Sequence, residues 1–234
     1  MVSAIIVAGG KGARMGAGMN KVFLPLLGKE IISRTIAVFE SSSLIDEIII
    51  VTASDDIPKM REIIWRDGYK KVARIAEGGR ERSDSVYNGL MLATGDISLI
   101  HDGARCLVTK EEIEAVIVDT IYFESAALGV KVKDTLKTID ENGNIVSTVD
   151  RKKTVHIQTP QGFNTAQIRD LHECAKKENI AVTDDCSIFE HYGKSVHLTE
   201  GSYDNIKITT PEDIAVAESI LKERKQCNEN WVRI

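Results

Sequence analysis

Short runs of apolar, mostly β-branched residues alternate along the first half of the chain with longer stretches whose apolar residues recur at helical spacing. The short runs predict strands, at residues 4–7, 47–52, 72–75 and 98–101. The longer stretches predict helices, at residues 30–40, 57–67 and 82–93. Strands separated by helices favour βαβ units. The pattern therefore predicts an α/β fold with a Rossmann-like, mostly parallel twisted sheet flanked by helices.

Residues that begin or end helices occur at matching places. Pro58 lies in the first turn of the second predicted helix, and Gly68 follows its last residue. Thr109 and Glu112 have the spacing of a capping box. Pro211 predicts the start of the last helix.

The pattern changes after residue 130. Residues 132–139 and 145–149 flank a run of turn formers, which predicts a β-hairpin. Its strands alternate polar and apolar residues in part, so one face would rest on another surface. A partner subunit is one candidate for that surface, and the main sheet, with the hairpin at its edge, is the other. Because no repeat or linker interrupts the chain, we expect one domain over residues 1–234, with a hairpin arm over 132–151 within it.

Composition narrows the class of protein. The 234 residues are 43% hydrophobic and 28% charged, which is ordinary for a folded protein and excludes a disordered or fibrous chain. A net charge of -5 argues against nucleic acid as a partner. Neither a long apolar run nor a basic leader suggests a membrane. The four cysteines are scattered, so we expect no zinc site or disulfide framework, and a cytoplasmic location.

A glycine-rich segment, residues 8–16, follows the first predicted strand. Glycine lets backbone N–H groups approach an anion closely, and Lys11, Arg14 and Lys21 would supply cations around a triphosphate. The segment is neither a P-loop nor a dinucleotide fingerprint, since Met15 stands where the latter needs its third glycine. The second predicted strand also lacks the acidic residue at its end that recognises ribose in NAD enzymes. We therefore expect phosphate binding without dehydrogenase chemistry.

Eight segments in register carry a resemblance to a known family. They are residues 8–16 with Asn20–Lys21, and residues 77–86, 101–105, 132–137, 148–151, 159–161, 183–185 and 204–207. In type and order they resemble those of the 2-C-methyl-D-erythritol 4-phosphate cytidylyltransferases, which belong to the sugar-phosphate nucleotidyltransferases. The segments extend over nearly the whole chain, so the resemblance is far more specific than one glycine-rich loop.

The resemblance implies an activity. It implies transfer of CMP from CTP to 2-C-methyl-D-erythritol 4-phosphate, with release of pyrophosphate. A ribitol 5-phosphate cytidylyltransferase would share the nucleotide loops, although residues 132–137 and 148–151 favour methylerythritol phosphate. A noncatalytic nucleotide-binding module would need no complete set of triphosphate cations, and a glycosyltransferase would be expected to show a D-x-D triplet, which the sequence lacks.

The resemblance also implies roles for individual residues. The expected catalytic cations are Arg14, Lys21 and Lys207. The residues expected to bind CTP are Ala8, Gly9, Gly10, Gly12, Gly79, Ser85, Asp102 and Gly103. The residues expected to bind the acceptor phosphate are Arg105, Thr135, Arg151, Thr159 and Thr183. The residues expected to hold Mg²⁺ are Asp102 and Asp204, although phosphates and water could supply most of its ligands. A homodimer joined by the arm is also expected.

Several of these residues have a plainer alternative. Ser85, or the nearby Ser83, could cap the helix predicted from residue 82, and Thr183 could cap a later helix. Asp102 could be a turn former after its strand. Lys207 lies in a strand-like run, where lysine is commonly an exposed edge residue.

Three residues depart from the family pattern. Arg80 stands where the family often carries Asp, Gly103 where it often carries Ala, and Cys106 where it usually carries Pro. Arg80 therefore lacks the carboxylate through which the family's Asp could contact the base, and Gly103 and Cys106 change the loop after Asp102.

Overall fold

A computed structural model of the protein describes residues 1–10 and 20–231. Seven strands form one central sheet in the order β11-β7-β10-β6-β1-β4-β5. Their bounds are β1 Val2–Val7, β4 Glu47–Thr52, β5 Val72–Glu77, β6 Ile97–Asp102, β7 Ser125–Lys131, β10 Val155–Asn164 and β11 His197–Glu200. Neighbouring strands are parallel except at β10, which runs antiparallel to both β6 and β7. The prediction of a mostly parallel α/β sheet is confirmed.

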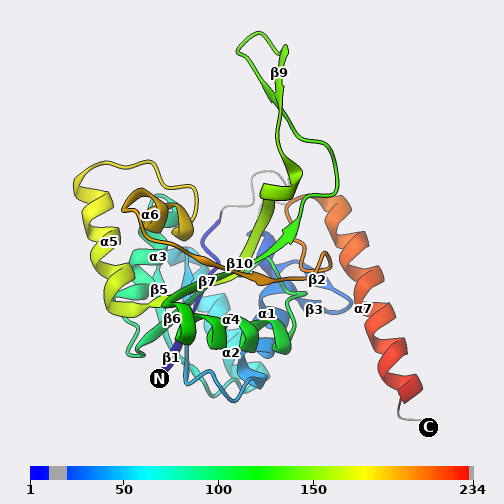
Figure 1. Ribbon diagram of the computed structural model, residues 1–234. Coiled ribbons are helices and arrows are strands. Elements are labelled where there is room, and N and C mark those ends of the chain that lie inside the picture. The colour runs from blue at the N-terminus through cyan, green and yellow to red at the C-terminus, as the bar shows by residue number, and fades with distance from the viewer. Residues whose placement is uncertain (11–19, 232–234) are drawn as a thin grey trace.

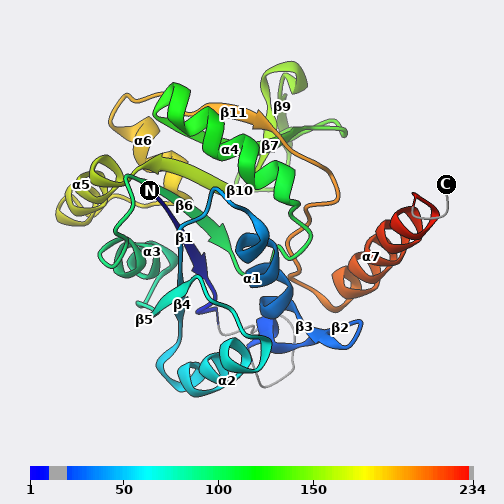
Figure 2. The same ribbon diagram turned by 90° about the horizontal axis from the view of Figure 1, so that it is seen from below.

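Helices cover both faces of this sheet (Figures 1 and 2). They are α1 Ile31–Ser41, α2 Ile57–Asp67, α3 Arg82–Leu90, α4 Lys110–Phe123, α5 Thr165–Lys177, α6 Asp185–His191 and α7 Pro211–Trp231. The short elements are β2 Pro25–Leu26, β3 Lys29–Glu30 and the 3-10 turns Lys21–Phe23, Ser54–Asp56 and Arg151–Lys153. The expected helix over 82–93 ends earlier, at Leu90.

Alternate side chains of each strand pack on opposite faces of the sheet. Ala4 and Ile6 of β1 belong to the apolar cluster under α1, α2 and α4, whereas Ile5 belongs to the cluster under α3, α5 and α6. All three are fully buried. Since both faces of the sheet are covered, the central strands β1, β4 and β6 are near-continuous apolar runs, which is why the sequence predicts them. The sequence did not predict β7, β10 and β11.

The predicted helix ends are observed. Thr109 accepts a hydrogen bond from the backbone N–H of Glu112 at 3.2 Å, and Glu112 accepts one from the N–H of Thr109 at 2.8 Å. Pro58 lies in the first turn of α2, and Gly68 ends that helix with a left-handed φ of 70°. The last helix begins at Pro211.

The hairpin forms a sheet of its own. Among the described residues, strands β8 Lys137–Ile139 and β9 Ile145–Thr148 pair only with each other. Figure 1 shows them projecting from the body of the protein. At its tip, Asp140 accepts hydrogen bonds from the N–H groups of Asn142 and Asn144. The alternative that placed the hairpin at the edge of the main sheet is wrong.

The segment before α7 also differs from the expectation. Lys207 was expected within a strand, but residues 205–209 are irregular. Ile208 donates its backbone N–H to the carbonyl of Ala104 at 3.0 Å and packs in a small apolar cluster with Leu26 and Ala217. This cluster holds the first turns of α7 against the body.

Within the described part of the chain, no helix combines the length and the apolar character that crossing a bilayer would need.

Candidate active site

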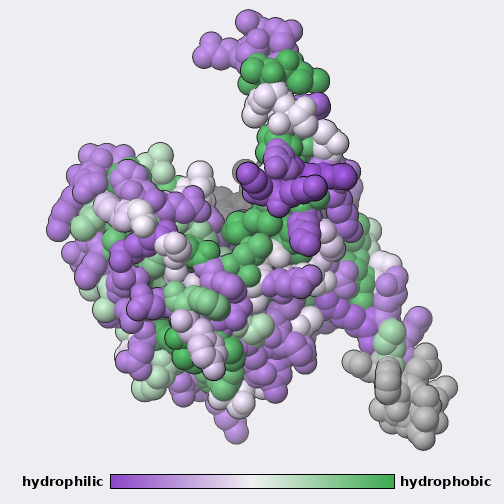
Figure 3. Space-filling view, in the orientation of Figure 1, coloured by the Kyte–Doolittle hydropathy of each residue, from purple (hydrophilic) through white to green (hydrophobic). Residues whose placement is uncertain are grey.

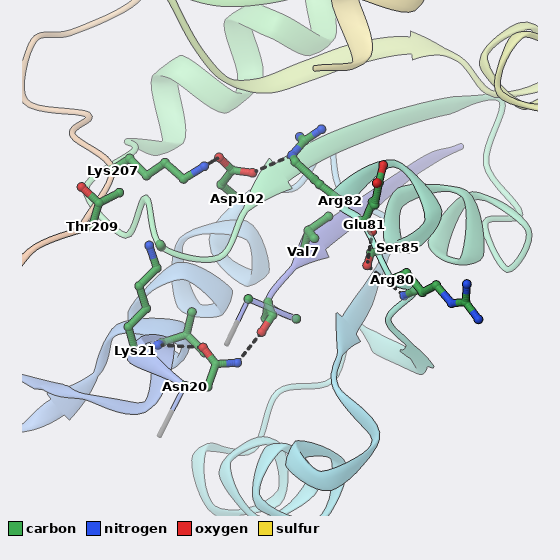
Figure 4. Close-up of a pocket in the computed structure, with 16 residues that line it drawn as sticks. Val7, Asn20, Lys21, Arg80, Glu81, Arg82, Ser85, Asp102, Lys207 and Thr209 are labelled. Atoms are coloured by element: carbon green, nitrogen blue, oxygen red, sulfur yellow. Dashed lines mark hydrogen bonds and ion pairs between the residues drawn. The ribbon is translucent and has the colours of Figure 1, made fainter. Parts of the chain in front are cut away.

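A cavity of about 470 Å³ lies beyond the carboxyl ends of β1, β5 and β6. The residues that line it are Val7, Ala8, Gly9, Gly10, Asn20, Lys21, Val22, Gly79, Arg80, Glu81, Arg82, Ser85, Asp102, Ala104, Lys207 and Thr209. In Figure 4, Lys21 and Lys207 lie on one side of the cavity, and Glu81 and Ser85 lie on the other. Open α/β sheets bind their ligands at this edge. Eight of the residues expected from the sequence line the cavity together: Ala8, Gly9, Gly10, Lys21, Gly79, Ser85, Asp102 and Lys207.

Asn20 fixes the position of the chain just before Lys21. Its side-chain amide donates to the carbonyl of Ala8 at 2.6 Å and to Asp56 at 2.9 Å, while its Oδ1 accepts from the N–H of Val22. Asn20 thereby caps the 3-10 turn that starts with Lys21. In Figure 4 the Lys21 side chain rises from this turn along the wall of the cavity.

The first residues of the glycine-rich segment differ in what they offer a ligand. The N–H of Ala8 donates to the carbonyl of Val51 at 2.7 Å, so it continues the sheet. Gly9 and Gly10 follow on the lining of the cavity, and among the described residues a Cβ on Gly10 would meet nothing within 4 Å. Two other expected residues, Gly12 and Arg14, lie outside the described residues.

Ser85 organises the loop that precedes α3. Its Oγ accepts from the N–H of Gly79 at 3.0 Å and donates to the carbonyl of Glu81 at 3.1 Å. The N-cap of α3 is Glu81, so the alternative that Ser83 or Ser85 caps this helix is wrong. A Cβ at Gly79 would lie 2.1 Å from the Cβ of Asp84, and only glycine fits there. The Arg80 guanidinium points away from the other labelled residues in Figure 4.

Asp102 ends β6 and is the electrostatic centre of the cavity. Its Oδ1 accepts from Nε of Arg82 at 3.2 Å, and its Oδ2 is 2.7 Å from Nζ of Lys207. Burial alone would raise the pKa of this carboxyl, but Arg82 and Lys207 hold that pKa well below its usual value. Asp102 is therefore an ionised carboxylate that holds two cations at the cavity wall.

Hydrogen bonds also fix the backbone of Asp102. Its N–H donates to Oγ1 of Thr159 at 3.1 Å, and that hydroxyl is 3.0 Å from Nδ1 of His101. Nε2 of His101 is 3.1 Å from the carbonyl of Arg105. A carbonyl only accepts, so Nε2 carries the proton and the Thr159 hydroxyl donates to Nδ1. Burial lowers the pKa of His101 to about 3, which keeps the ring neutral.

Some expected residues surround this site without lining the cavity. Gly103 donates its N–H to Val7, and its carbonyl accepts from Thr35 at 2.9 Å, so both groups are used within the fold. Arg105 donates from NH1 to the carbonyl of Asn205 at 2.8 Å, and its Nε is 4.0 Å from Asp102.

Thr183 is exposed, and the residue that caps α6 is Asp184. The capping alternative for Thr183 is therefore wrong.

Thr135 and Arg151 lie on the arm. Both are exposed: Thr135 precedes β8, and Arg151 begins the turn Arg151–Lys153 three residues after the end of β9. Neither lines the cavity of its own chain.

The structure does not join Asp204 to Asp102. Asp204 lies 3.3 Å from NH2 of Arg224 on α7 and does not line the cavity. Among the described residues, no group of three or more His, Cys, Asp or Glu side chains has the arrangement of a metal site. Glu81 and Asp102 are the carboxylates that line the cavity, and Asp102 is the buried one. A single carboxylate with substrate phosphates and water suits Mg²⁺.

Sequence reasoning missed part of the site. Arg82 lines the cavity beside Asp102 and also donates to Asp185, which in turn contacts His172. Arg82 lies in one of the eight segments, 77–86, so a signal for it existed. Asp185 lies in another of them, 183–185, whereas His172 lies in none and joins the site only through its contact with Asp185.

A mostly parallel α/β sheet with two lysines, two arginines and glycine backbone around a cavity beyond its strand ends is the setting of an enzyme that binds a phosphorylated ligand such as a nucleotide. Comparisons with known proteins narrow this class. The family model of 2-C-methyl-D-erythritol 4-phosphate cytidylyltransferase matches residues 2–223. The chain belongs to this family.

Relatives and solved structures agree. The 2-C-methyl-D-erythritol 4-phosphate cytidylyltransferase of Clostridium botulinum (strain Okra / Type B1) is 47% identical over 223 residues, which are 94% of this chain and 97% of that relative. The protein of that name from Clostridium acetobutylicum is 46% identical over 225 residues, 95% of this chain and 98% of the relative.

Among solved structures, the 4-diphosphocytidyl-2C-methyl-D-erythritol synthase of Anaerococcus prevotii superposes with a TM-score of 0.86 and 30% identity, over 95% of this chain and 96% of that one. The cytidylyltransferase of Thermus thermophilus gives 0.77 and 27% identity, over 95% and 100% of the two chains.

The buried neutral His101 predicts an acid sensitivity of the fold. Its pKa is lowered in the folded state, so the unfolded chain binds more protons below the ordinary histidine pKa, and stability falls as the pH drops toward about 3. Between about pH 6.5 and about pH 4.5, His101 should account for a loss of about 2 kcal/mol in the free energy of unfolding. Denaturant titrations should show this loss shrinking in His101→Gln but persisting in the exposed-histidine control His191→Gln. An equal pH dependence in all three proteins would contradict the assignment.

Proposed function

We propose that the protein transfers CMP from CTP to 2-C-methyl-D-erythritol 4-phosphate, forming 4-diphosphocytidyl-2-C-methyl-D-erythritol and pyrophosphate. The observation that carries the proposal is the gathering of Lys21, Arg82 and Lys207 around Asp102 beyond the strand ends. Membership of the cytidylyltransferase family supports the choice of reaction.

The reaction joins two anions. An oxygen of the acceptor phosphate forms a bond to the α-phosphorus of CTP, while the bond between that phosphorus and the oxygen bridging to the β-phosphate breaks. The electron pair leaves with pyrophosphate. Since a phosphate monoester is already ionised near neutral pH, no strong base is needed, and repulsion between the anions is the main obstacle. Cations fixed around the phosphorus reduce this repulsion.

The lysines would supply this charge from two sides. Lys207, in the irregular segment before α7, is proposed to contact the α-phosphate, and Lys21, after the glycine-rich segment, the β- and γ-phosphates. Arg14 is proposed to join them on the basis of the family resemblance. The N–H groups of Gly9 and Gly10 would bind phosphate oxygens as part of an anion-binding loop.

The loop around Ser85 would recognise the base. Gly79 and Ser85 line one side of the cavity, and the Ser85 hydroxyl already fixes the N–H of Gly79. We propose that this rigid wall binds cytosine through the remaining backbone groups of the loop and leaves too little room for a purine.

A divalent magnesium ion is proposed as the cofactor. Asp102 would hold it together with phosphate oxygens and water, and it would neutralise charge on the departing pyrophosphate. Asp204 is not retained as a second ligand, because it pairs with Arg224.

A reducing, cytoplasmic setting is proposed from the thiols. All four cysteines are free, and burial raises the pKa of the Cys106 thiol to about 11.

The nucleotide and the acceptor can be tested in one assay. Pyrophosphate release should require CTP, Mg²⁺ and methylerythritol phosphate, and should be far slower with ATP or GTP. Faster release with ribitol 5-phosphate would reassign the acceptor. Equal turnover with a purine nucleotide would contradict the base assignment, and no release with any polyol phosphate would favour a noncatalytic nucleotide-binding module.

Lys21→Ala and Lys207→Ala should each lower kcat by about 100- to 1,000-fold, because each removes a fixed cation from the transition state. Steady-state kinetics with CTP would measure the loss, and thermal unfolding should show the fold intact. Lys222→Ala, which removes an exposed lysine on α7, is the matched control and should keep wild-type kcat. A near-normal kcat in Lys21→Ala or Lys207→Ala would remove that lysine from the reaction.

We further propose that the arm crosses to a second copy of the chain and completes the acceptor site there. Its apolar side chains Ile139, Ile145 and Val146 are each about two-thirds exposed, at 66%, 68% and 65%, and Figure 3 shows apolar surface along it. A two-stranded hairpin is marginal in water unless it rests on another surface. Thr135 and Arg151 would then contact the acceptor in the partner's cavity, as the family resemblance implies.

Mixed subunits test the crossing. An Arg151→Ala chain and a Lys21→Ala chain should each be inactive alone. In a heterodimer, one site combines the intact cavity of the first chain with the intact arm of the second, so random mixing should restore about a quarter of wild-type activity. Sedimentation should show a dimer. A monomer at working concentration, or no recovery despite subunit exchange, would contradict the proposal.

A further inference from the structure

Arg82 joins two carboxylates that come from different elements of the fold. Its Nε is 3.2 Å from Oδ1 of Asp102, which ends β6, and its NH1 is 2.7 Å from Oδ2 of Asp185, which begins α6. The Arg82 side chain lines the cavity and is 27% exposed. Because a guanidinium is planar and rigid, two hydrogen bonds from different nitrogen atoms fix the orientation of its plane.

Asp185 has no contact with solvent. Its side chain is 0% exposed, and a carboxylate in such a place must be paired and hydrogen-bonded. One oxygen accepts from Arg82, and the other is 3.1 Å from Nε2 of His172. Burial would raise the pKa of Asp185, but Arg82 and His172 lower it, so the carboxyl is ionised. Both of its oxygens are thus occupied.

His172 completes the set from α5. Its side chain is 4% exposed, and because an ionised carboxylate only accepts hydrogen bonds, Nε2 of His172 must carry a proton. A continuous chain of contacts therefore runs from His172 through Asp185 and Arg82 to Asp102. It connects α5, α6 and α3 to the end of β6 at the cavity.

We propose that Asp185 and His172 are positioning residues that hold the guanidinium of Arg82 against Asp102. Without them Arg82 could swing toward solvent or toward a bound phosphate, and Oδ1 of Asp102 would lose its partner. Asp102 would then no longer present a fixed carboxylate to the ligand. This inference rests on the proposed function only in taking the cavity to be the place of reaction.

Three variants probe the pair, and one matched control accompanies them. Asp185→Asn removes the charge at nearly constant volume, and His172→Phe removes the donor but keeps a ring. His172→Gln restores a donor, because its amide nitrogen can take the place of Nε2.

The control is Glu47→Gln. Glu47 is a carboxylate with a 9% exposed side chain, and it is held by Ser3, Thr94 and Arg74. It lies at the amino end of β4, which is the opposite end of the sheet from the cavity.

Steady-state kinetics should distinguish a positioning role of Asp185 and His172 from a mere contribution to the stability of the fold. Loss of a supporting hydrogen bond behind an active-site group typically costs about 10- to 100-fold. We expect kcat to fall by that factor in Asp185→Asn and His172→Phe, with a smaller change in the KM for CTP. His172→Gln should recover kcat to within a few-fold of wild type. Glu47→Gln should lose thermal stability and keep its kcat, so an equal kcat loss in Glu47→Gln would overturn the inference.

A second measurement does not depend on turnover. In NMR spectra the Arg82 Nε–H signal, assigned by its absence in Arg82→Lys, should exchange slowly with solvent in the wild-type protein. Its exchange should be at least about tenfold faster in Asp185→Asn and His172→Phe and unchanged in Glu47→Gln. Unchanged exchange in both variants would overturn the positioning role even if the enzyme is active. The expected pattern in a protein that transfers no CMP would uphold that role and reject the proposed function. If His172→Phe does not fold, Asp185→Asn decides alone.

Discussion

The site is organised around one buried carboxylate at the end of a central strand. An ionised Asp102 is tolerated there only because cations and hydrogen bonds surround it. Arg82 comes from α3 and Lys207 from the segment before α7, so satisfying this one charge ties together parts of the chain that are far apart in sequence. The backbone is fixed as well, since Thr159 on β10 accepts from the N–H of Asp102 and contacts the buried ring of His101. The two cations that neutralise Asp102 also line the cavity, so the same contacts position part of its wall.

Much of the fold was predictable because local pattern and tertiary environment agree. Strands β1, β4 and β6 are covered on both faces, so nearly every residue in them is buried and the sequence of each is a continuous apolar run. The pattern failed where single contacts outside the local sequence decide the conformation. Polar and apolar residues alternate around Lys207 as in a strand. However, the buried Asn205 side chain donates to the carbonyl of Thr159, and the N–H of Ile208 donates to the carbonyl of Ala104. Those bonds replace a strand ladder, and no local pattern encodes them.

The site shows the same division. Lys21, Ser85 and Asp102 lie in the eight segments that resemble the family, and they line one cavity as the sequence predicted. Asp204 was assigned beside Asp102 because it precedes Lys207 closely, yet its carboxylate faces Arg224 on α7. Asp185 lies in the segment 183–185, but its role was overlooked because Arg82 is 103 positions away and only the fold brings the two side chains within 2.7 Å. Proximity in sequence is therefore a weak guide to which charged side chains form ion pairs, because tertiary contacts decide the partner of each.

Arg82 and Lys207 share the carboxylate of Asp102, and this affects how a phosphate ligand can bind. Lys207 contacts Asp102 through Nζ, and its side chain is 39% exposed, so it can reach a ligand. If Lys207 turns to an incoming phosphate, Asp102 still keeps Arg82 on its other oxygen, and Arg82 is itself held by the buried Asp185. The carboxylate is therefore not left unpaired when the lysine moves, which is the change that would cost most in a buried setting. Lys207 also starts from an ordered position near the phosphate site, so less side-chain freedom is lost on binding. The rigid arginine and the movable lysine have different tasks on the same carboxylate, which explains why the two cations differ in kind.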